Sequence, residues 1–251
     1  AKTHQHAFTP RIGLVYNVLS STNLYATWIR GFEPQSVTVQ SNPDAGGPFD
    51  PLKSELWEVG LKGDYLKGRL SVTAALFDLR NTLYNAWVAG EPNLMVPIGE
   101  ERSRGFELDI AGSLLPYWSV VASYAFNEAE ITKAPTGTRD LNLQRPGTPR
   151  HSANLWTKLI IPSGALRGLG IGLGVNGVSE RLGQVGRRAH VVSYPGYALV
   201  HAALYYKIHA VQLQLNLNNI LNKTHWVGGY DKLRSFPGAP RNVNISISYK
   251  F

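Results

Sequence analysis

The chain has 251 residues, a formal net charge of +8 and no cysteine. This length suffices for one large sheet or a sizeable core, and the lack of cysteine excludes a disulfide framework and a thiolate metal site. The basic residues form no dense run of the kind that binds nucleic acid. Because no run of ~18 apolar residues occurs, the sequence also predicts no transmembrane helix.

Segments in which apolar and polar residues alternate recur along the whole chain. Successive side chains of a strand point to opposite faces, so each segment predicts a strand with one apolar and one polar face. We count about eleven such strands, which makes the predicted fold all-β. In chain order they cover residues 12–18, 24–28, 57–65, 70–76, 106–110, 118–126, 153–159, 169–175, 198–208, 211–217 and 243–251.

The last predicted strand is the most regular of the set. From Asn242 to the end of the chain, apolar residues alternate without exception with Asn, Ser and Lys, and the chain stops on Tyr249-Lys250-Phe251. A strand that lies between lipid and an aqueous lumen requires this pattern. A soluble sheet rarely ends on an exposed aromatic residue, so the segment favours a membrane barrel.

Short and long connections alternate between the predicted strands. In an antiparallel meander this alternation places every long connection at one end and every tight turn at the other. Outer-membrane barrels have short periplasmic turns and long outer loops, so we predict an antiparallel transmembrane β-barrel whose C-terminus is periplasmic. The long connections cover residues 32–51, 83–98, 131–149, 180–195 and 222–240.

An odd number of strands does not close a bacterial antiparallel barrel. Two open edges in lipid would leave backbone groups without partners. We therefore expect that the chain is the C-terminal part of a larger barrel, or that a further strand lies near residues 33–50. In the first case the last strand, residues 243–251, is paired on one side only within this chain.

Two motifs with possible chemistry have simpler explanations. Gly172, Gly174 and Gly177 have the spacing of a dinucleotide-binding loop, but that motif needs a helix directly after it. Here the glycines continue a strand pattern, and we expect them to admit the close approach of a plug or a neighbouring segment. His4 and His6 lack a third ligand, so we predict no metal site. With no triad or paired-carboxylate spacing, we predict no catalytic residue and no enzyme.

The long connections combine aromatic and basic side chains. Arginine supplies charge and a fork of donors, which suits an anionic, partly aromatic ligand. Alternatively, some of these residues belong to the outer aromatic girdle or contact lipopolysaccharide. The candidate ligand-binding residues are Tyr84, Trp87, Arg139, Arg187, Arg188, Trp226, Tyr230 and Arg234, and the same set includes Arg145, His190 and Lys232.

Polar residues on the inner faces of the predicted strands are expected to line the lumen or to hydrogen-bond a plug. Around the predicted strand at residues 106–110, we expect the acidic residues to pair with Arg102 and Arg104. The acidic residues near this strand are Glu100, Glu101, Glu107 and Asp109. The candidate lumen- or plug-facing residues are Glu107, Asp109, Asn216, Asn218, Asn244 and Ser246.

Six stretches resemble the C-terminal barrel half of TonB-dependent outer-membrane receptors, especially ferric-siderophore receptors. They follow the family order over nearly the whole chain. The resemblance implies that residues 1–251 form half of a plugged barrel of about 22 strands, without the plug domain and the N-terminal barrel strands. Tyr249 and Phe251 match the aromatic end that the barrel-assembly machinery recognises in that family. The six stretches are residues 22–32, 51–61, 101–108, 148–154, 217–223 and 237–242.

The resemblance implies a receptor in the outer membrane of a Gram-negative bacterium that takes up a ferric siderophore with energy delivered through TonB. Ferric iron would be carried only as the chelate, with no resident cofactor, and TonB would act through the N-terminal region. Outer-membrane lipid, lipopolysaccharide and the barrel-assembly machinery are the other implied partners. Three alternatives stay open: a passive outer-membrane porin of the same barrel class, a soluble all-β binding module, and half of a split receptor whose partner chain supplies the plug and the early strands.

Overall fold

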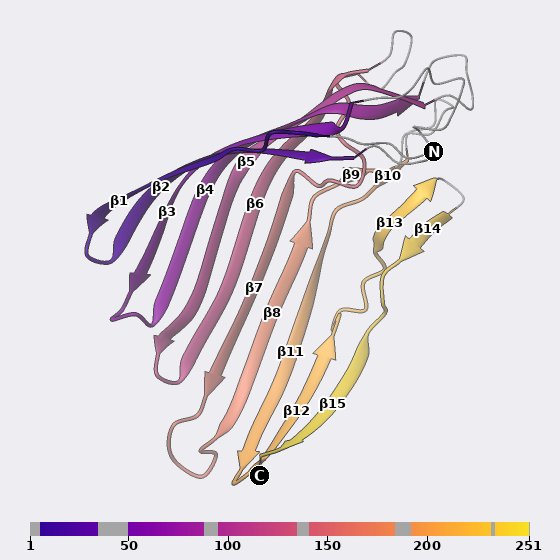
Figure 1. Ribbon diagram of the computed structural model, residues 1–251. Coiled ribbons are helices and arrows are strands. Elements are labelled where there is room, and N and C mark those ends of the chain that lie inside the picture. Colours follow the sequence, from indigo (N-terminus) through magenta and orange to yellow (C-terminus); the bar gives the residue numbers. More distant parts are fainter. Residues whose placement is uncertain are drawn as a thin grey trace.

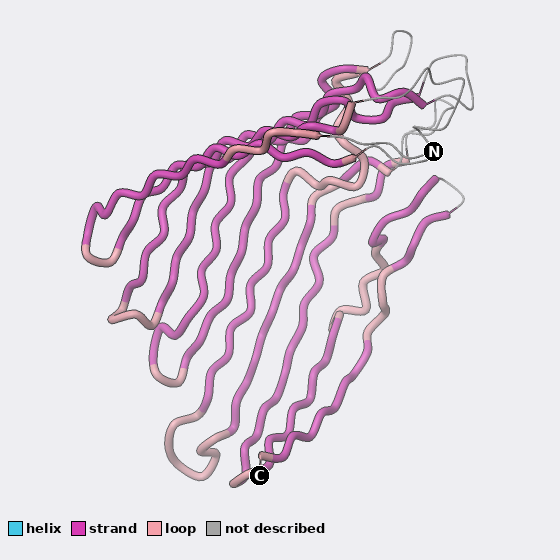
Figure 2. The backbone as a smooth tube through the Cα atoms, in the orientation of Figure 1, coloured by secondary structure: helices cyan, strands magenta, loops and turns pink. Residues whose placement is uncertain are grey.

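Eleven strands form one antiparallel sheet that curves strongly from edge to edge in the computed structural model (Figures 1 and 2). The structure describes residues 6–34, 50–87, 95–134, 141–183, 192–231 and 234–250. In these ranges no helix has the length and apolar character needed to cross a membrane. The expected all-β fold and its eleven alternating strands are confirmed.

The strands of the sheet are neighbours in chain order. They are β1 (Arg11–Leu19), β2 (Thr22–Glu33), β3 (Leu52–Tyr65), β4 (Leu70–Trp87), β5 (Met95–Leu115), β6 (Trp118–Lys133), β7 (His151–Ile160), β8 (Leu169–Val178), β11 (Tyr197–Ile208), β12 (Val211–Asn218) and β15 (Asn242–Tyr249). Two short hairpins lie outside the sheet. One joins β9 (Arg181–Leu182) to β10 (Ser193–Tyr194), and the other joins β13 (Trp226–Asp231) to β14 (Arg234–Pro237).

The tight turns and the remaining connections lie at opposite ends of the sheet (Figure 1). The predicted alternation holds along the chain except at the connection between β4 and β5. There the two strands continue to Trp87 and Met95, because residues 84–87 pair with residues 95–99. Most of the predicted loop 83–98 is therefore strand. The further strand expected near residues 33–50 cannot be compared, because residues 35–49 lie outside the described residues.

The strand register lines up apolar side chains on one face of the sheet, called the apolar face below. Leu204 lies opposite Ile171 on one side and Leu215 on the other, and Leu215 lies opposite Ile245. These side chains are solvent-exposed, from 37% for Leu215 to 73% for Ile245. An exposed, continuous apolar face of this kind suits contact with lipid.

Aromatic residues mark both ends of the apolar face. Trp28 and Trp57 lie side by side near the long-connection end, with ring centroids 5.9 Å apart. Tyr65 lies on the same face at the turn end of β3, where its hydroxyl hydrogen-bonds Thr22 at 3.0 Å. At ~3.3 Å per residue, about 26 Å of strand separates Trp57 from Tyr65. A tilted strand needs ~9–11 residues to cross the apolar band of a membrane barrel, and the nine residues from Trp57 to Tyr65 meet this length.

The opposite face, called the polar face below, carries glycines in β8 that make room for aromatic rings. A Cβ atom built at Gly174 would lie 2.2 Å from a ring atom of Trp156, and one at Gly172 would lie 2.6 Å from the same ring. The glycines therefore continue a strand, and the segment that approaches them is the neighbouring strand β7. The nucleotide-binding interpretation is excluded because β8 ends in an irregular segment rather than a helix.

We expect the Gly174→Ala substitution to lower the free energy of unfolding by about 1–3 kcal/mol, because the new methyl group must displace the Trp156 ring. Urea unfolding of the intact protein, followed by tryptophan fluorescence, measures this change. Gly228→Ala, in β13, is the control, because a Cβ atom at Gly228 meets no atom within 4 Å. Equal effects of the two substitutions would contradict this explanation of the glycines.

The two edges of the sheet are β1 and β15. Within the described part of the chain, β15 pairs with β12 alone and β1 pairs with β2 alone. The prediction that the last strand is paired on one side only is therefore confirmed for residues 242–249. Phe251, the last residue of the chain, lies outside the described residues.

Candidate functional site

A polar pocket forms where β6 extends beyond the start of β7. The segment 142–145 takes the place of β7 there and pairs with β6. Its Arg145 amide donates to the Ala129 carbonyl at 2.8 Å, and the Ile131 amide donates to the Leu143 carbonyl at 3.0 Å. This pairing brings the Arg145 side chain over the polar face, next to β5.

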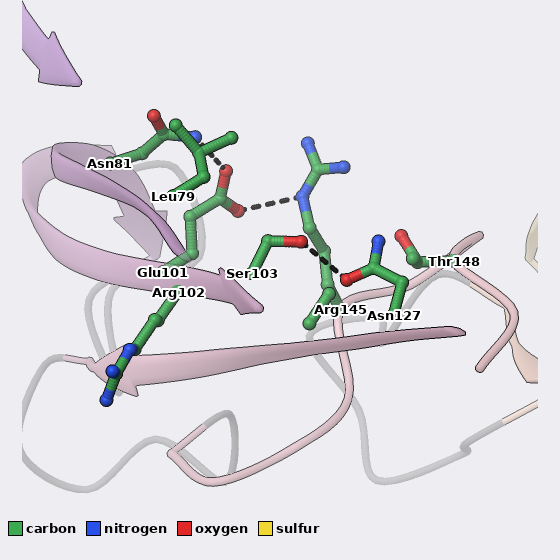
Figure 3. Close-up of a pocket in the computed structure, with 9 residues that line it drawn as sticks. Leu79, Asn81, Glu101, Arg102, Ser103, Asn127, Arg145 and Thr148 are labelled. Atoms are coloured by element: carbon green, nitrogen blue, oxygen red, sulfur yellow. Dashed lines mark hydrogen bonds and ion pairs between the residues drawn. The ribbon is translucent and has the colours of Figure 1, made fainter. Parts of the chain in front are cut away.

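Glu101 of β5 lies at the centre of this pocket. The residue is only 8% exposed, and both carboxylate oxygens have partners (Figure 3). Oε1 accepts a hydrogen bond from Asn81 Nδ2 at 2.9 Å, and Oε2 accepts one from Arg145 Nε at 2.8 Å. A buried carboxylate needs such partners, and here one of them is a cation that it holds in place.

Arg145 is itself half-exposed, with 52% of its side chain accessible. Only its Nε atom contacts Glu101, while both η nitrogens point away from the carboxylate (Figure 3). Among the described residues, no partner of these η nitrogens is found. The pair therefore presents an oriented cation with free donors, which is the arrangement that binds carboxylate or other oxyanion groups.

The cavity beside this pair has a volume of about 130 Å³. Pockets that enclose a whole drug-sized ligand measure ~300–1,000 Å³, so this cavity suits one polar group of a larger ligand. Ser103 and Asn127 add a hydroxyl and an amide, joined at 2.6 Å. The lining residues are Leu79, Asn81, Glu101, Arg102, Ser103, Asn127, Ala129, Arg145 and Thr148.

The predicted pairing of these acidic residues with Arg102 and Arg104 is wrong. Arg102 forms an ion pair with Asp78, and Arg104 forms one with Glu128 at 3.0 Å. Even-numbered and odd-numbered residues of β5 point to opposite faces, so neither arginine shares a face with Glu101. Glu107 and Asp109 lie on the same face as Glu101, so they too are on the face opposite to the two arginines. Glu100 does share the face of the arginines, but it pairs with Lys133 at 2.8 Å.

The predicted ligand-binding residues are dispersed in the structure. Trp226, Tyr230 and Arg234 lie in the β13–β14 hairpin, whereas Tyr84 and Trp87 lie in β4 rather than in a loop. Outside the described residues lie Arg139, Arg187, Arg188, His190 and Lys232. Of the members of the larger aromatic and basic set that the structure describes, only Arg145 lines the cavity described above.

Sequence reasoning overlooked Asn81, Ser103, Asn127 and Thr148 as site residues. A signal was present in β5, where Glu101 and Ser103 precede Glu107 and Asp109 on one face. That signal indicates a polar face, but it does not reveal that the segment 142–145 pairs with β6 and brings Arg145 to Glu101.

The six predicted lumen-facing residues all lie on the polar face, Glu107 and Asp109 in β5 and the other four in β12 and β15. In those two strands the register places Asn216 opposite Asn244, and Gln214 opposite Ser246. Asn218 donates to Asn242 at 2.9 Å. These contacts form a ladder of amide and hydroxyl side chains along the edge of the sheet.

Residues 1–220 match a protein family described as TonB dependent receptor-like, beta-barrel. The chain is 32% identical over 251 residues to the metal-pseudopaline receptor CntO of Pseudomonas aeruginosa (strain UCBPP-PA14), and this match covers 98% of the chain and 34% of that receptor. It is 30% identical over 249 residues to the ferric-pyoverdine BN7/BN8 receptor of Pseudomonas putida, covering 97% of the chain and 28% of that receptor.

The fold also matches that of solved receptors. The crystal structure of the siderophore receptor PiuA from Acinetobacter baumannii superposes with a TM-score of 0.83 at 23% identity, over 96% of this chain and 35% of that one. The chain thus spans about a third of the length of these relatives. The eleven-stranded sheet with its exposed apolar face is consistent with the β-barrel family that residues 1–220 match. The chain belongs to the TonB-dependent receptor family, whose members are transporters of the Gram-negative outer membrane and not enzymes.

Proposed function

We propose that the chain is the C-terminal part of the barrel of a receptor that imports a ferric siderophore or a related metal chelate, driven through TonB. The observation that carries this proposal is the Arg145 side chain, which the buried Glu101 carboxylate orients at the long-connection end of the polar face. Family membership supports it, as do relatives that are named as receptors for metal-pseudopaline and ferric pyoverdine.

The chemistry of Arg145 suits such a ligand. Chelators of hard metal ions offer oxygen donors, and many of these carry negative charge that an arginine fork binds well. The cavity of about 130 Å³ beside Arg145 would admit one such group. The remainder of the chelate would then lie along the polar face, above the aqueous path.

Further strands of the same receptor would complete the barrel between the open edges of β1 and β15, because unpaired edges are costly in lipid. A plug would fill the lumen and meet the polar face. In this proposal the residues that face the plug or the path are Glu107, Asp109, Asn216, Asn218, Asn244 and Ser246. Lipid and lipopolysaccharide would cover the apolar face, and the assembly machinery would recognise Tyr249 and Phe251.

The tight turns and the C-terminus would face the periplasm, and the long connections would face the outside. Because the chain has no cysteine, each single substitution adds one labelling site to it, and the unsubstituted receptor gives the background. We expect a membrane-impermeant maleimide to label Val227→Cys, in β13, on intact cells, but to label Ser163→Cys, in the turn between β7 and β8, only after permeabilisation. Both residues are exposed. Labelling of Ser163→Cys on intact cells would reverse the proposed orientation.

Uptake measurements test the proposed transport. Cells that carry the complete receptor should accumulate radioactive iron from at least one member of a panel of ferric chelates, and deletion of TonB should abolish this accumulation. A purified receptor that conducts ions steadily in single-channel recordings, with no TonB-dependent uptake of any chelate, would instead identify a passive porin.

A further inference from the structure

The two hairpins outside the sheet come from different long connections, but they are joined to each other. The Tyr194 hydroxyl of β10 hydrogen-bonds Ser235 Oγ of β14 at 3.0 Å. Arg181 of β9 donates from an η nitrogen to the backbone carbonyl of Trp226 in β13. Through these two contacts the β13–β14 hairpin covers the β9–β10 hairpin.

Arg181 is buried at this junction with no carboxylate partner in the part of the chain that the structure describes. It is 5% exposed, and its guanidinium carbon lies 5.8 Å from the ring centroids of both Tyr194 and Tyr197. Across the described residues it forms no ion pair with a carboxylate. Its second η nitrogen is buried and has no hydrogen-bond partner there.

The buried guanidinium, unpaired among the described residues, destabilises the state in which the β13–β14 hairpin covers Arg181. A buried cation is normally paired, and a buried donor without an acceptor forfeits the hydrogen bonds that it made with water. Cation–π contact with two tyrosine rings offsets only a part of this cost. The junction therefore holds a cation that would be stabilised by any anionic group able to reach it.

The junction is closely packed while the hairpins are in contact. A Cβ atom at Gly229 would lie 2.0 Å from the Tyr194 hydroxyl, and one at Gly238 would lie 1.8 Å from the ring of His225. That ring in turn packs against the Tyr197 ring at a tilted angle, with centroids 4.7 Å apart. Because Arg181 is only 5% exposed, an anion in solution cannot contact its guanidinium unless a covering segment moves. β13 is such a segment, because its Trp226 carbonyl accepts a hydrogen bond from Arg181.

We propose that Arg181 is an oxyanion-binding residue that the β13–β14 hairpin covers in this state, and that it binds an oxyanionic group of the imported ligand when the hairpins separate. Arg181 then exchanges the Trp226 carbonyl for a charged acceptor, while Tyr194 and Tyr197 flank the bound group. The natural ligand follows from the proposed function, but binding of an oxyanion to Arg181 can be measured whether or not the receptor transports anything.

The experiment titrates the purified complete receptor with inorganic phosphate, replacing chloride at constant ionic strength. Tryptophan emission is the readout, because the backbone of Trp226 contacts Arg181 directly. We expect a saturable change in the wild type and at least a tenfold weaker phosphate affinity in Arg181→Gln. Arg181→Lys keeps the charge but loses the fork of donors, so it should retain part of the response.

Trp226→Phe serves as the signal control. The chain has six tryptophans, and this substitution removes one ring while it keeps the backbone carbonyl that accepts from Arg181. It should therefore remove most of the emission change without removing the site. Heat-dependent migration in gels verifies that each variant is folded. An unresponsive wild type, or an Arg181→Gln titration that matches the wild type, would overturn the proposal.

A second arm identifies the source of the oxyanion. A chelate that the receptor imports should compete with phosphate in the wild type and should not do so in Arg181→Gln. Phosphate binding without such competition would overturn the assignment of the site to the imported ligand. Failure of uptake with intact, Arg181-dependent phosphate binding would count against the proposed transport alone.

Discussion

The Leu215→Arg receptor should fail to assemble in the outer membrane. Leu215 lies on the apolar face in the middle of β12, between Leu204 and Ile245. An arginine on the lipid face of a barrel costs ~2–4 kcal/mol at the bilayer midplane, which is a large part of the stability of a typical fold. The amount of heat-modifiable, folded receptor in isolated outer membranes measures the outcome.

Gln214→Arg is the matched control, because it introduces the same side chain one residue away. Gln214 lies on the polar face, opposite Tyr205 and Ser246. There the guanidinium stays in a polar environment, and we expect near-normal assembly. If both variants assembled equally well, the assignment of the apolar face to lipid would be wrong.

Replacing Glu101 by Ala should weaken ligand binding by at least about tenfold, or about 1.4 kcal/mol. Without the carboxylate, Arg145 loses the hydrogen bond that orients it, and Asn81 loses its acceptor. Arg145→Ala should weaken binding at least as much, because it removes the proposed contact itself. Equilibrium binding of the ferric chelate that cells import, to receptor in detergent, gives both affinities.

Arg104→Ala is the control for the loss of a positive charge near this site. Arg104 lies on β5 close to Glu101 in sequence, but it pairs with Glu128 on the opposite face of the sheet. Its removal should leave the affinity within about twofold, as expected for an exposed ion pair with little energetic weight. Loss of affinity in Arg104→Ala and not in Arg145→Ala would place the ligand elsewhere.

The strands could be predicted because their signal is local. In the segment 169–175, each residue reveals its face through its own polarity, and the register then aligns Leu173 with Thr157 and Ala202 without changing that assignment. The odd number of predicted strands indicated the one-sided edge at residues 243–251, and β15 does pair with β12 alone among the described residues. These features depend on neighbours in sequence and on the contrast between lipid outside a membrane barrel and water inside it.

The two short hairpins were not predicted, because they lack such a local signal. β9 and β10 have two residues each, which is too short for any periodic pattern. They are held by side chains from another connection, among them Ser235, which is 41 residues from Tyr194 in sequence. No local pattern in the segment 180–195 encodes a partner that far away.

The candidate site shows the same division. Glu101 and Arg145 are 44 residues apart, and they meet only because the segment 142–145 pairs with the part of β6 that extends beyond β7. The sequence by itself determined the strands, their two faces, the end at which the long connections gather and the family. The tertiary structure alone decided which arginine reaches Glu101, and that Arg181 is buried with no carboxylate partner among the described residues. Polarity is a property of each residue, whereas these pairings depend on where separate ladders and hairpins bring distant residues together.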